Sequence, residues 1–469
     1  MTPYATQPAA DADLRAENAR LREELARLQE QLAAALAEIE RLKRSSKRQA
    51  TPFSKGTRHQ KPQKPGRKPG QGPFACRAAP SPASVTARVR VPMTPPACPA
   101  CGGILQPDGE EVVTVTDLPP LLRPTITAYH LARCRCARCG RRMRARHPAV
   151  APDQRGATAH RLGLRVLAAA HWLHYGLGVP VRKLPALLFT LTGVEVTQGA
   201  LTQDALRRAA QEVGHAYEAL RQQVCQAPAT YTDDSGWKVG GENAFLMTFT
   251  TADTTLFQIR ARHRNAEVRE VIPGDYAGVM VCDRAPSYDA GALAAVKQQK
   301  CLAHVQRSLT EALTEQGGRA RHFPRQLQAL LTAAIALWHR YQAGEVTAAQ
   351  LAAERERLQT AVTAHLRERR LTNRTNQKLL NELGWHHDRG NLLRFLYEPE
   401  VEPTNNRAER ALRPAVIARK VSHCSKNAAG AAAHAAFASV CVTLRQRGVG
   451  SLVSALTALF RTGAVAAPT

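Results

Sequence analysis

The sequence predicts a multidomain α+β protein, and three observations support this prediction. Its 469 residues exceed the roughly 100–200 residues of a single ordinary domain. Apolar residues recur at helical spacing on both sides of a central stretch, 228–304, that reads mostly as short strands. Before the first of these helices come a leucine heptad and closely spaced cysteine pairs. We therefore expect a mixed core preceded by small modules.

Basic residues strongly outnumber acidic ones. The 65 Lys and Arg residues oppose 38 Asp and Glu residues, which gives a formal net charge of +27. A surplus of this size favours a polyanionic partner, with nucleic acid ahead of an anionic membrane. No uninterrupted apolar run reaches the length of about 18 residues that spans a membrane, and the N-terminal stretch MTPYATQPAADAD has neither a basic start nor an apolar stretch. Neither a membrane span nor a signal peptide is expected.

A heptad pattern over 13–43 predicts a coiled coil, because two apolar seams persist for about four heptads. One seam consists of Leu14, Leu21, Leu28, Ala35 and Leu42, and the other of Asn18, Leu25, Leu32 and Ile39. Asn18 inside a seam favours a parallel two-stranded register. The segment is therefore expected to form a homo-oligomer. The alternative is one amphipathic helix packed on its own chain.

A basic segment and a cysteine-rich segment follow. Residues 44–75 combine Lys, Arg and Pro-Gly breaks with almost no apolar residues, so they are interpreted as a disordered linker that contacts phosphates or acts as a tether. Within 90–145, the motifs CPACGG and CRCARCGRR bracket a stretch of strand character. Two CxxC pairs followed by glycine predict a tetrahedral zinc ribbon and a reduced compartment. The predicted ligands are Cys98, Cys101, Cys136 and Cys139, with Cys134 as a spare.

The next segment, 157–222, reads as helices. The stretch VRKLPALLFTLTGVEVTQGALTQDALRRAA suggests a helix, a turn and a second helix, with Gly193 ending the first and Thr197 capping the second. This order suits a helix-turn-helix DNA reader, although ordinary helix pairs show the same pattern.

From 228 the pattern changes to that of strands. ATYTDD predicts a short strand that ends in carboxylates, AFLMTFTTADTTLFQIR predicts a hairpin, NAEVREVIP predicts a helix, and GVMVCD predicts a buried strand that ends at Asp283. Apolar stripes over 305–400 predict a helical insertion. The chain closes with helices from 405 onward, and 426–469 are expected to form C-terminal helices.

Three acids from distant positions are candidates for one site. Asp233 and Asp283 lie at predicted strand ends, and Glu409 opens a predicted helix. Phosphodiester chemistry uses two divalent ions about 3.5–4 Å apart, and two or three convergent carboxylates suffice to hold Mg²⁺ or Mn²⁺. Glu409 also has a plainer interpretation. With Asn406 as the N-cap, it would close a capping box three residues on.

With these residues in view, the sequence resembles bacterial insertion-sequence transposases of the sixty-six family, the TnpC-type proteins. The resemblance covers nearly the whole chain. It rests on the zipper, the linker KPGRKPGQG, the cysteine motifs, and the blocks DDSGWKVGG, GDYAGVMVCDRAPSY, CLAHVQRSL, NNRAERALRP and ARK. It implies an RNase H-like, retroviral integrase-like catalytic core that is formed by 228–304 and 402–425 and carries a DDE triad.

The resemblance also implies roles for individual residues. Asp233, Asp283 and Glu409 match the metal-binding triad. Family members usually read Asp-Glu-Thr or Asp-Glu-Ser at the first block, where this chain has Asp234, so the choice between the two aspartates is open at this point. Since a strand alternates its faces, only one of them points into the site, and Asp233 is preferred. The predicted supporting residues are Cys301, His304, Asn406 and Arg410, and the predicted phosphate contacts are Arg407, Arg413, Arg419 and Lys420.

The implied activity is that of a DNA transposase. It would bind the terminal inverted repeats of an insertion sequence, hydrolyse their 3′ ends and join the freed 3′-OH to target DNA, with Mg²⁺ or Mn²⁺ in the site and structural Zn²⁺ elsewhere. Accessory proteins of the same element are further candidate partners, and the bacterial cytoplasm, at the nucleoid, is the expected location. The alternatives are a catalytically silent DNA-binding protein derived from a transposase and a structure-specific nuclease on the same fold.

Overall fold

The computed structural model describes residues 17–33, 81–89, 99–104, 112–116, 122–147, 149–150, 154, 162–367 and 370–465. The predicted linker 44–75 and Cys98 lie outside the described residues. The chain divides into two units, Met1–Thr114 and Val115–Thr469. In the first unit, a helix spans 17–33 and a 3-10 turn, η1, spans Pro82–Ser84.

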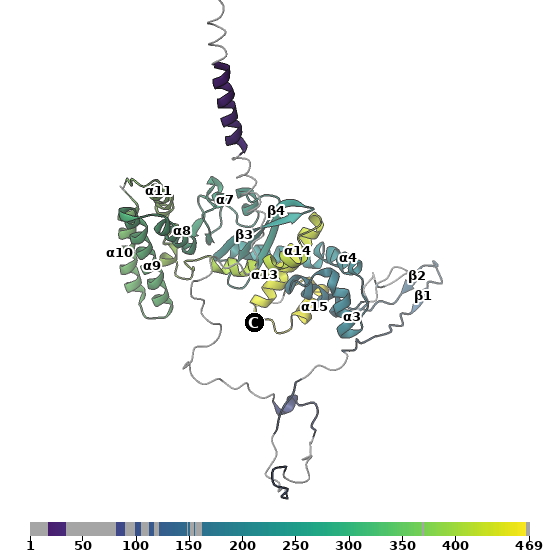
Figure 1. The fold of residues 1–469 in the computed structure, drawn as a ribbon. Coiled ribbons are helices and arrows are strands. Elements are labelled where there is room, and N and C mark those ends of the chain that lie inside the picture. The colour runs from purple at the N-terminus through teal and green to yellow at the C-terminus, as the bar shows by residue number, and fades with distance from the viewer. Residues whose placement is uncertain are drawn as a thin grey trace, which may run out of the picture. The chain divides into compact units, whose positions relative to one another are not determined.

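The second unit contains a small hairpin, a five-stranded sheet and many helices (Figure 1). The strands are β1 (Arg133–Arg135), β2 (Arg142–Arg144), β3 (Ala229–Val239), β4 (Glu242–Thr250), β5 (Thr255–Arg260), β6 (Val279–Cys282) and β7 (Lys297–Lys300). The α-helices are α2 (Leu164–His171), α3 (Leu184–Thr192), α4 (Gln198–Ala209), α5 (Glu212–Gln226), α6 (Asn265–Arg269), α7 (Pro286–Asp289), α8 (Leu302–Glu315), α9 (His322–Gln342), α10 (Ala348–Leu366), α11 (Arg374–Asp388), α12 (Arg394–Tyr397), α13 (Asn406–Ser422), α14 (Ala428–Gln446) and α15 (Leu452–Thr462). Short turns of other helix types are η3 (Trp172–Gly176), η4 (Val181–Lys183), η5 (Gly291–Leu293) and η6 (Gly318–Arg321).

The sheet has the strand order β5-β4-β3-β6-β7. β3, β4 and β5 pair antiparallel, whereas β3, β6 and β7 pair parallel. The turn between β3 and β4 consists of Gly240 and Gly241, whose φ angles of 62° and 93° suit glycine. The prediction of a mixed α/β core is confirmed, as is the predicted β4–β5 hairpin.

One strand differs from the prediction in length. ATYTDD was expected to end at its acids, but β3 continues to Val239 and pairs with β4 along its length. Asp233 and Asp234 therefore lie in the middle of a strand. Continuous pairing with β4 outweighs the weak strand preference of the Asp-Asp-Ser-Gly stretch, because sheet context dominates local preference.

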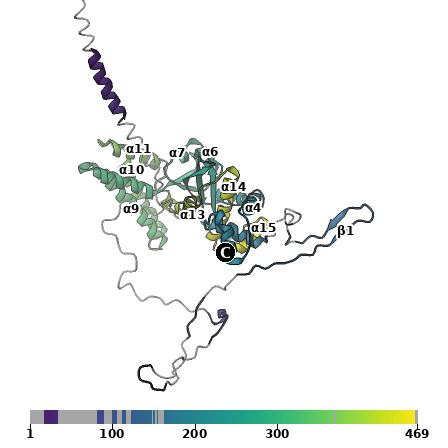
Figure 2. The same ribbon diagram turned by 45° about the vertical axis from the view of Figure 1, so that its right-hand side comes forward.

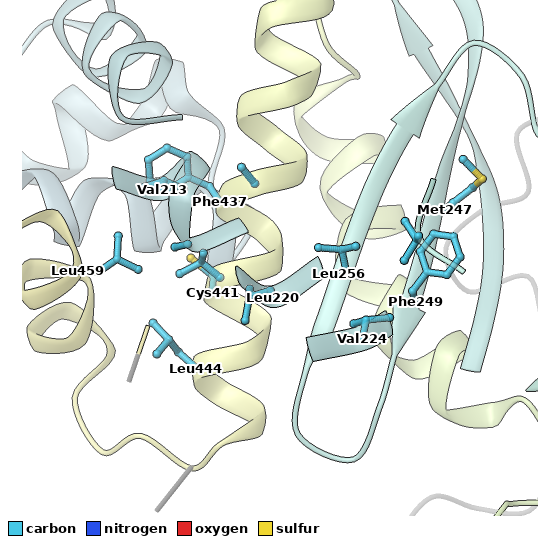
Figure 3. Packing of buried hydrophobic residues seen from close by; sticks show 14 of the residues in the cluster. Val213, Leu220, Val224, Met247, Phe249, Leu256, Phe437, Cys441, Leu444 and Leu459 are labelled. Carbon is cyan, nitrogen blue, oxygen red and sulfur yellow. The ribbon is translucent and has the colours of Figure 1, made fainter. Parts of the chain in front are cut away.

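Helices cover both faces of the sheet. Met247, Phe249 and Leu256 pack on one face with apolar residues of α5, α14 and α15. Figure 3 shows part of this cluster, with Leu220 of α5 and Cys441 of α14 among its members. On the other face, Tyr231, Val279 and Val281 pack against α8 and the helices that follow it. The sheet is thus a buried central layer, which fixes the positions of the acids along its strands.

The helices between β7 and α13 form a group of their own. α8 to α12 share one apolar cluster with β6 and with Ala408 of α13. Both views show α9, α10 and α11 gathered beside the sheet (Figures 1 and 2). The segment is helical, as the sequence pattern indicates.

Helix α14 is long and apolar enough to cross a membrane by length and composition alone. However, 61% of its most apolar window is buried inside the protein, where it packs against β5 and α5. It is therefore a core helix in the part of the chain that the structure describes.

The helix–turn–helix pattern before the sheet forms as predicted. α3 ends at Gly193, which has a left-handed φ of 70°, and the Thr197 hydroxyl accepts a hydrogen bond from Ala200 N at the start of α4. α4 buries Leu201 and Asp204 and exposes Thr202 and Gln203.

Candidate active site

Asp233 and Asp234 lie on opposite faces of β3, because successive side chains of a strand point to opposite sides of the sheet. Tyr231, Ser235 and Trp237 share the face of β3 that meets the chain around α13. The Tyr231 hydroxyl accepts a hydrogen bond from Glu402 N at 2.9 Å, and Ser235 Oγ accepts one from Arg419 at 3.2 Å. Asp233 lies on the same face, because side chains two residues apart along a strand point to the same side of the sheet.

Asp234 points to the opposite side. Its Oδ1 lies 3.1 Å from His263 Nδ1, and His263 Nε2 lies 3.3 Å from Ser287 Oγ. Asp234 is therefore in contact with a histidine and not with the other acids. The structure therefore favours Asp233 as the member of the candidate site.

Asp283 directly follows β6, as predicted. The parallel register of β3 and β6 pairs Tyr231 with Val281, so two residues further on Asp233 and Asp283 reach the same level of the sheet. Asp283 Oδ1 accepts a hydrogen bond from Ala285 N at 2.8 Å, which fixes the carboxylate at the strand end. The neighbouring Arg284 bonds to Glu382 and Ser308, and thereby ties this strand end to the helical segment.

Glu409 lies in the first turn of α13, but it closes no capping box. The N-cap is Asn405, not Asn406, and it makes no side-chain capping bond. Asn405 Nδ2 instead donates to Thr232 O at 2.7 Å, and Asn405 N donates to Cys301 Sγ at 3.1 Å. The capping interpretation of Asn406 and Glu409 is therefore wrong, since the asparagine side chain is used to fasten α13 to β3.

These contacts bring three distant segments together. Burial is the main cause that raises the pKa of the Asp233 carboxyl to about 7. The neighbouring Asp234 and the charges of Asp283 and Glu409 add to the shift, while the Asp234 backbone N–H partly offsets it. Asp283 and Glu409 thus lie within electrostatic reach of Asp233, although they are 50 or more residues away along the chain.

The donor chemistry of this cluster suits a hard divalent cation. Asp233 Oδ1 and Asp283 Oδ1 each accept a backbone N–H, and their second oxygens have no hydrogen-bond partner among the described residues. Carboxylate oxygens are the ligands that Mg²⁺ and Mn²⁺ prefer. Among the described residues, no group of three or more His, Cys, Asp and Glu side chains is arranged so that it could hold a metal ion.

Two residues next to this cluster were predicted to support it. His304 Nε2 lies 3.8 Å from Glu409 Oε1. Burial raises the pKa of the Cys301 thiol, and its sulfur accepts a hydrogen bond from Asn405 N. Both contacts support a positioning role and not a role as zinc ligands.

The basic residues of α13 divide into two groups. Arg407 forms an ion pair with Glu402 at 2.6 Å and also donates to Thr251 O, so it braces the loop before α13. Arg410 and Arg413 are exposed and form no ion pair within the described part of the chain. Of the predicted phosphate contacts, Arg407 is thus already engaged.

Sequence reasoning missed two residues of this region. Asn405 was passed over in favour of Asn406, and nothing in the sequence separates two adjacent asparagines. His263 was not considered, because it stands outside every acidic block and reaches Asp234 only through the fold.

The second cysteine pair forms a tight knuckle. Cys136 N donates to Arg141 O at 2.8 Å, Gly140 N donates to Cys136 O at 2.9 Å, and Gly140 has a φ of 72°. The backbone N–H groups of Cys139 and Arg138 lower the pKa of the Cys136 thiol, which favours the thiolate that zinc binds. Cys134 lies instead in β1, opposite Met143. The knuckle favours Cys136 and Cys139 over Cys134 as ligands.

Replacing both Cys136 and Cys139 with serine is expected to remove one zinc ion per chain, because two of the four predicted thiolate ligands are lost. Elemental analysis of the purified full-length protein measures this. Cys134→Ser is the matched control and should retain zinc. Zinc loss in Cys134→Ser, with retention in the double variant, would transfer the ligand role to Cys134.

A mixed sheet that carries clustered acids, in a chain with a net charge of +27, is typical of enzymes that act on nucleic acid. Residues 160–433 match the family model described as Transposase IS66 family, and this range contains all three acids. Because the match covers more than half of the chain, the protein belongs to the IS66 transposase family. Membership implies an enzyme that binds DNA and cuts and joins it. No curated protein matches the chain.

Proposed function

We propose that the protein binds the ends of an insertion sequence, cleaves their 3′ ends and joins them to target DNA, using Asp233, Asp283 and Glu409 to hold two divalent metal ions. The observation that carries this proposal is the raised pKa of Asp233, to which the charges of Asp283 and Glu409 contribute. Such a cluster of like charges is costly without a cation and well suited to binding one.

The strand arrangement supports the RNase H-like core that the sequence resemblance implies. Three antiparallel strands are followed by two parallel ones. Asp233 lies on β3, and Asp283 directly follows β6, the strand that pairs in parallel with β3. Glu409 arrives from a helix beyond the helical segment α8 to α12.

The protein's own groups would position the reactants. When bound, Mg²⁺ or Mn²⁺ activates the attacking oxygen and stabilises the leaving one. Asn405 holds the start of α13, which carries Glu409, against β3 beside Asp233, and His304 lies 3.8 Å from Glu409. Arg410 and Arg413, exposed on α13, would bind the phosphates that flank the scissile bond. No protein nucleophile is needed, because water and then the 3′-OH attack.

A joining assay tests this proposal. The full-length protein would be mixed with pre-cut element ends, taken from the DNA that flanks its reading frame, and with target plasmid in Mg²⁺. Covalent joining of the ends to the plasmid is expected. Cutting without joining would identify a nuclease, and binding without either reaction would identify a silent DNA-binding protein.

The N-terminal helix supports assembly into an oligomer. Leu21, Leu25, Leu28 and Leu32 are each more than half exposed, although their spacing forms one apolar stripe. Such a stripe is stabilised by a second copy of itself.

Leu25→Glu is expected to dissociate this oligomer in the full-length protein, because it places a charge in the apolar seam. Light scattering measures the molar mass. Ala26→Glu introduces the same charge at the neighbouring position, outside both seams, and should leave the mass unchanged. Equal masses for wild type and Leu25→Glu would show that the stripe does not mediate assembly.

A further inference from the structure

A cavity of about 560 Å³ lies at the edge strand β7, between this strand and the end of α11. Its volume falls within the range of about 300–1,000 Å³ that is typical of sites for small organic ligands. The proposed cleavage site does not use it, since the lining comes from β7, the chain before it and the segment around α11 and α12.

One wall of the cavity carries an aromatic platform. Trp385 is 38% exposed, which is unusual for the largest apolar side chain. The Arg389 guanidinium lies 3.6 Å from the centre of the indole ring, in a cation–π contact, and both residues line the cavity. An indole with an attached guanidinium is a surface on which a planar, electron-rich ring stacks well.

The floor of the cavity carries an unused hydrogen-bonding group. Asn391 is only 5% exposed and lines the cavity, yet its carboxamide has no hydrogen-bond partner among the described residues. An amide that opens into the cavity and makes no hydrogen bond to the described residues is available to a ligand that both donates and accepts. The Nε of Arg394, also in the lining, is buried and lacks a partner as well.

Backbone hydrogen bonds at the end of α11 fix the position of Asn391. α11 ends in a Schellman motif, in which Gly390 N donates to His387 O at 2.8 Å and Asn391 N donates to His386 O at 2.9 Å. Gly390 has a φ of 69°, which only glycine adopts without strain. Asn391 O then accepts a hydrogen bond from Lys300 N at 2.7 Å, which anchors the turn to β7.

The charges around the cavity favour an anionic ligand. Lys297, Arg389 and Arg394 line it, and Glu398 pairs with Lys297 at 3.1 Å and approaches Arg394 at 3.9 Å. The one acid in the lining, Asp289, is neutralised by the buried Lys300 at 2.7 Å. Positive charge therefore remains in excess beside an aromatic platform.

We propose that this cavity binds an unpaired nucleotide of the DNA on which the enzyme acts. The base would stack on Trp385 and bond through its edge to Asn391, and the attached phosphate would lie against Arg389 or Arg394. The identification of the ligand as DNA rests on the proposed function; the binding chemistry rests on the cavity alone. A base inside a duplex cannot enter, so the site selects frayed, flipped or single-stranded positions.

Binding of labelled DNA to the full-length protein tests this proposal. A blunt duplex would be compared with the same duplex carrying a short single-stranded overhang, at either end of the strand, without added Mg²⁺ or Mn²⁺ so that no cleavage occurs. Wild type should prefer the overhang, and Trp385→Ala should lose about 5- to 100-fold in affinity for it, the effect of losing a base-stacking aromatic. Affinity for the blunt duplex should stay nearly constant.

Tyr397→Ala is the matched control. Tyr397 is 41% exposed and carries Arg355 in a similar cation–π contact at 4.1 Å, but it does not line the cavity. This variant should keep the overhang preference, and Trp385→Phe should recover much of it. If Trp385→Ala only lowers the melting temperature and binds both DNAs like wild type, Trp385 and Arg389 merely stabilise the end of α11 and the proposal is wrong.

A measurement on the wild type covers the case in which Trp385→Ala fails to fold. 4-Thiothymidine in the overhang should photo-crosslink to the peptide that contains Trp385 and Asn391, and crosslinks confined to other peptides would overturn the proposal. Free deoxyadenosine monophosphate serves as a competitor. If it binds more tightly than the overhang, the ligand is a free nucleotide and not a DNA strand. The binding and crosslinking measurements need no catalysis. A negative result in them can therefore be distinguished from a failure of the proposed cleavage activity.

Discussion

Glu409→Gln is expected to reduce strand cleavage in Mg²⁺ by about 10³-fold or more, the scale that is typical for loss of an essential catalytic group. A neutral amide is a much poorer ligand for Mg²⁺ than a carboxylate. The fold should change little, because Glu409 makes no capping bond, and its helix is held by the Asn405 bonds to Thr232 and Cys301. The loss of its charge near the start of α13 costs about 0.3–1 kcal/mol.

Cleavage of a labelled element end, together with DNA binding and thermal melting, measures this prediction. Glu311→Gln is a matched control, because Glu311 is exposed on α8 and forms no ion pair within the described residues. Glu402→Gln would be a poor control, since Glu402 pairs with Arg407. Near-normal cleavage by Glu409→Gln would remove Glu409 from the catalytic site.

Asp233→Asn is expected to abolish cleavage and, above pH 7, to stabilise the protein. Burial raises the pKa of Asp233 to about 7, so between its unfolded pKa and that value the folded protein keeps a proton that the unfolded chain has lost. Stability from this group therefore falls as the pH rises toward 7. The neutral asparagine avoids this loss, and at pH 8 we expect a gain of about 1–3 kcal/mol in the free energy of unfolding.

Denaturant unfolding between pH 4 and pH 8 measures this gain, which should shrink toward zero as the pH falls to about 4, the pKa of an aspartate in the unfolded chain. Mg²⁺ should raise the melting temperature of the wild type and have little effect on Asp233→Asn, because a ligand of the folded state stabilises it. Asp234→Asn is the control. It removes the charge beside His263, and since the raised pKa is that of Asp233, it should show no such gain. A gain in Asp234→Asn and none in Asp233→Asn would reverse the assignment of the two aspartates.

The sequence was informative where a strand is buried and sharply bounded. GVMVCD is a short apolar run that ends in an acid, and β6 and Asp283 follow that pattern. The turns at Gly193 and Thr197 were also predictable, because each depends on the residue itself and its immediate neighbours.

Other features depend on contacts between distant segments. The length of β3 is set by its pairing with β4, which its own residues do not reveal. The use of Asn405 to hold β3 needs Thr232 and Cys301 in place, and the ion pair of Arg407 needs Glu402 folded back toward it. The sequence around α13 suggested a capping box of Asn406 and Glu409 and an unpaired Arg407. In the structure, contacts with distant segments take the place of both.

Anomalous scattering from Mn²⁺, in crystals of the full-length protein soaked at pH 8, tests the central claim most directly. Mn²⁺ takes the same oxygen ligands as Mg²⁺ and can be located by its own scattering. We predict manganese bound by carboxylate oxygens of Asp233, Asp283 and Glu409, with Asp234 still paired to His263. Manganese held by Asp234 and His263, or none at the three acids, would contradict the account.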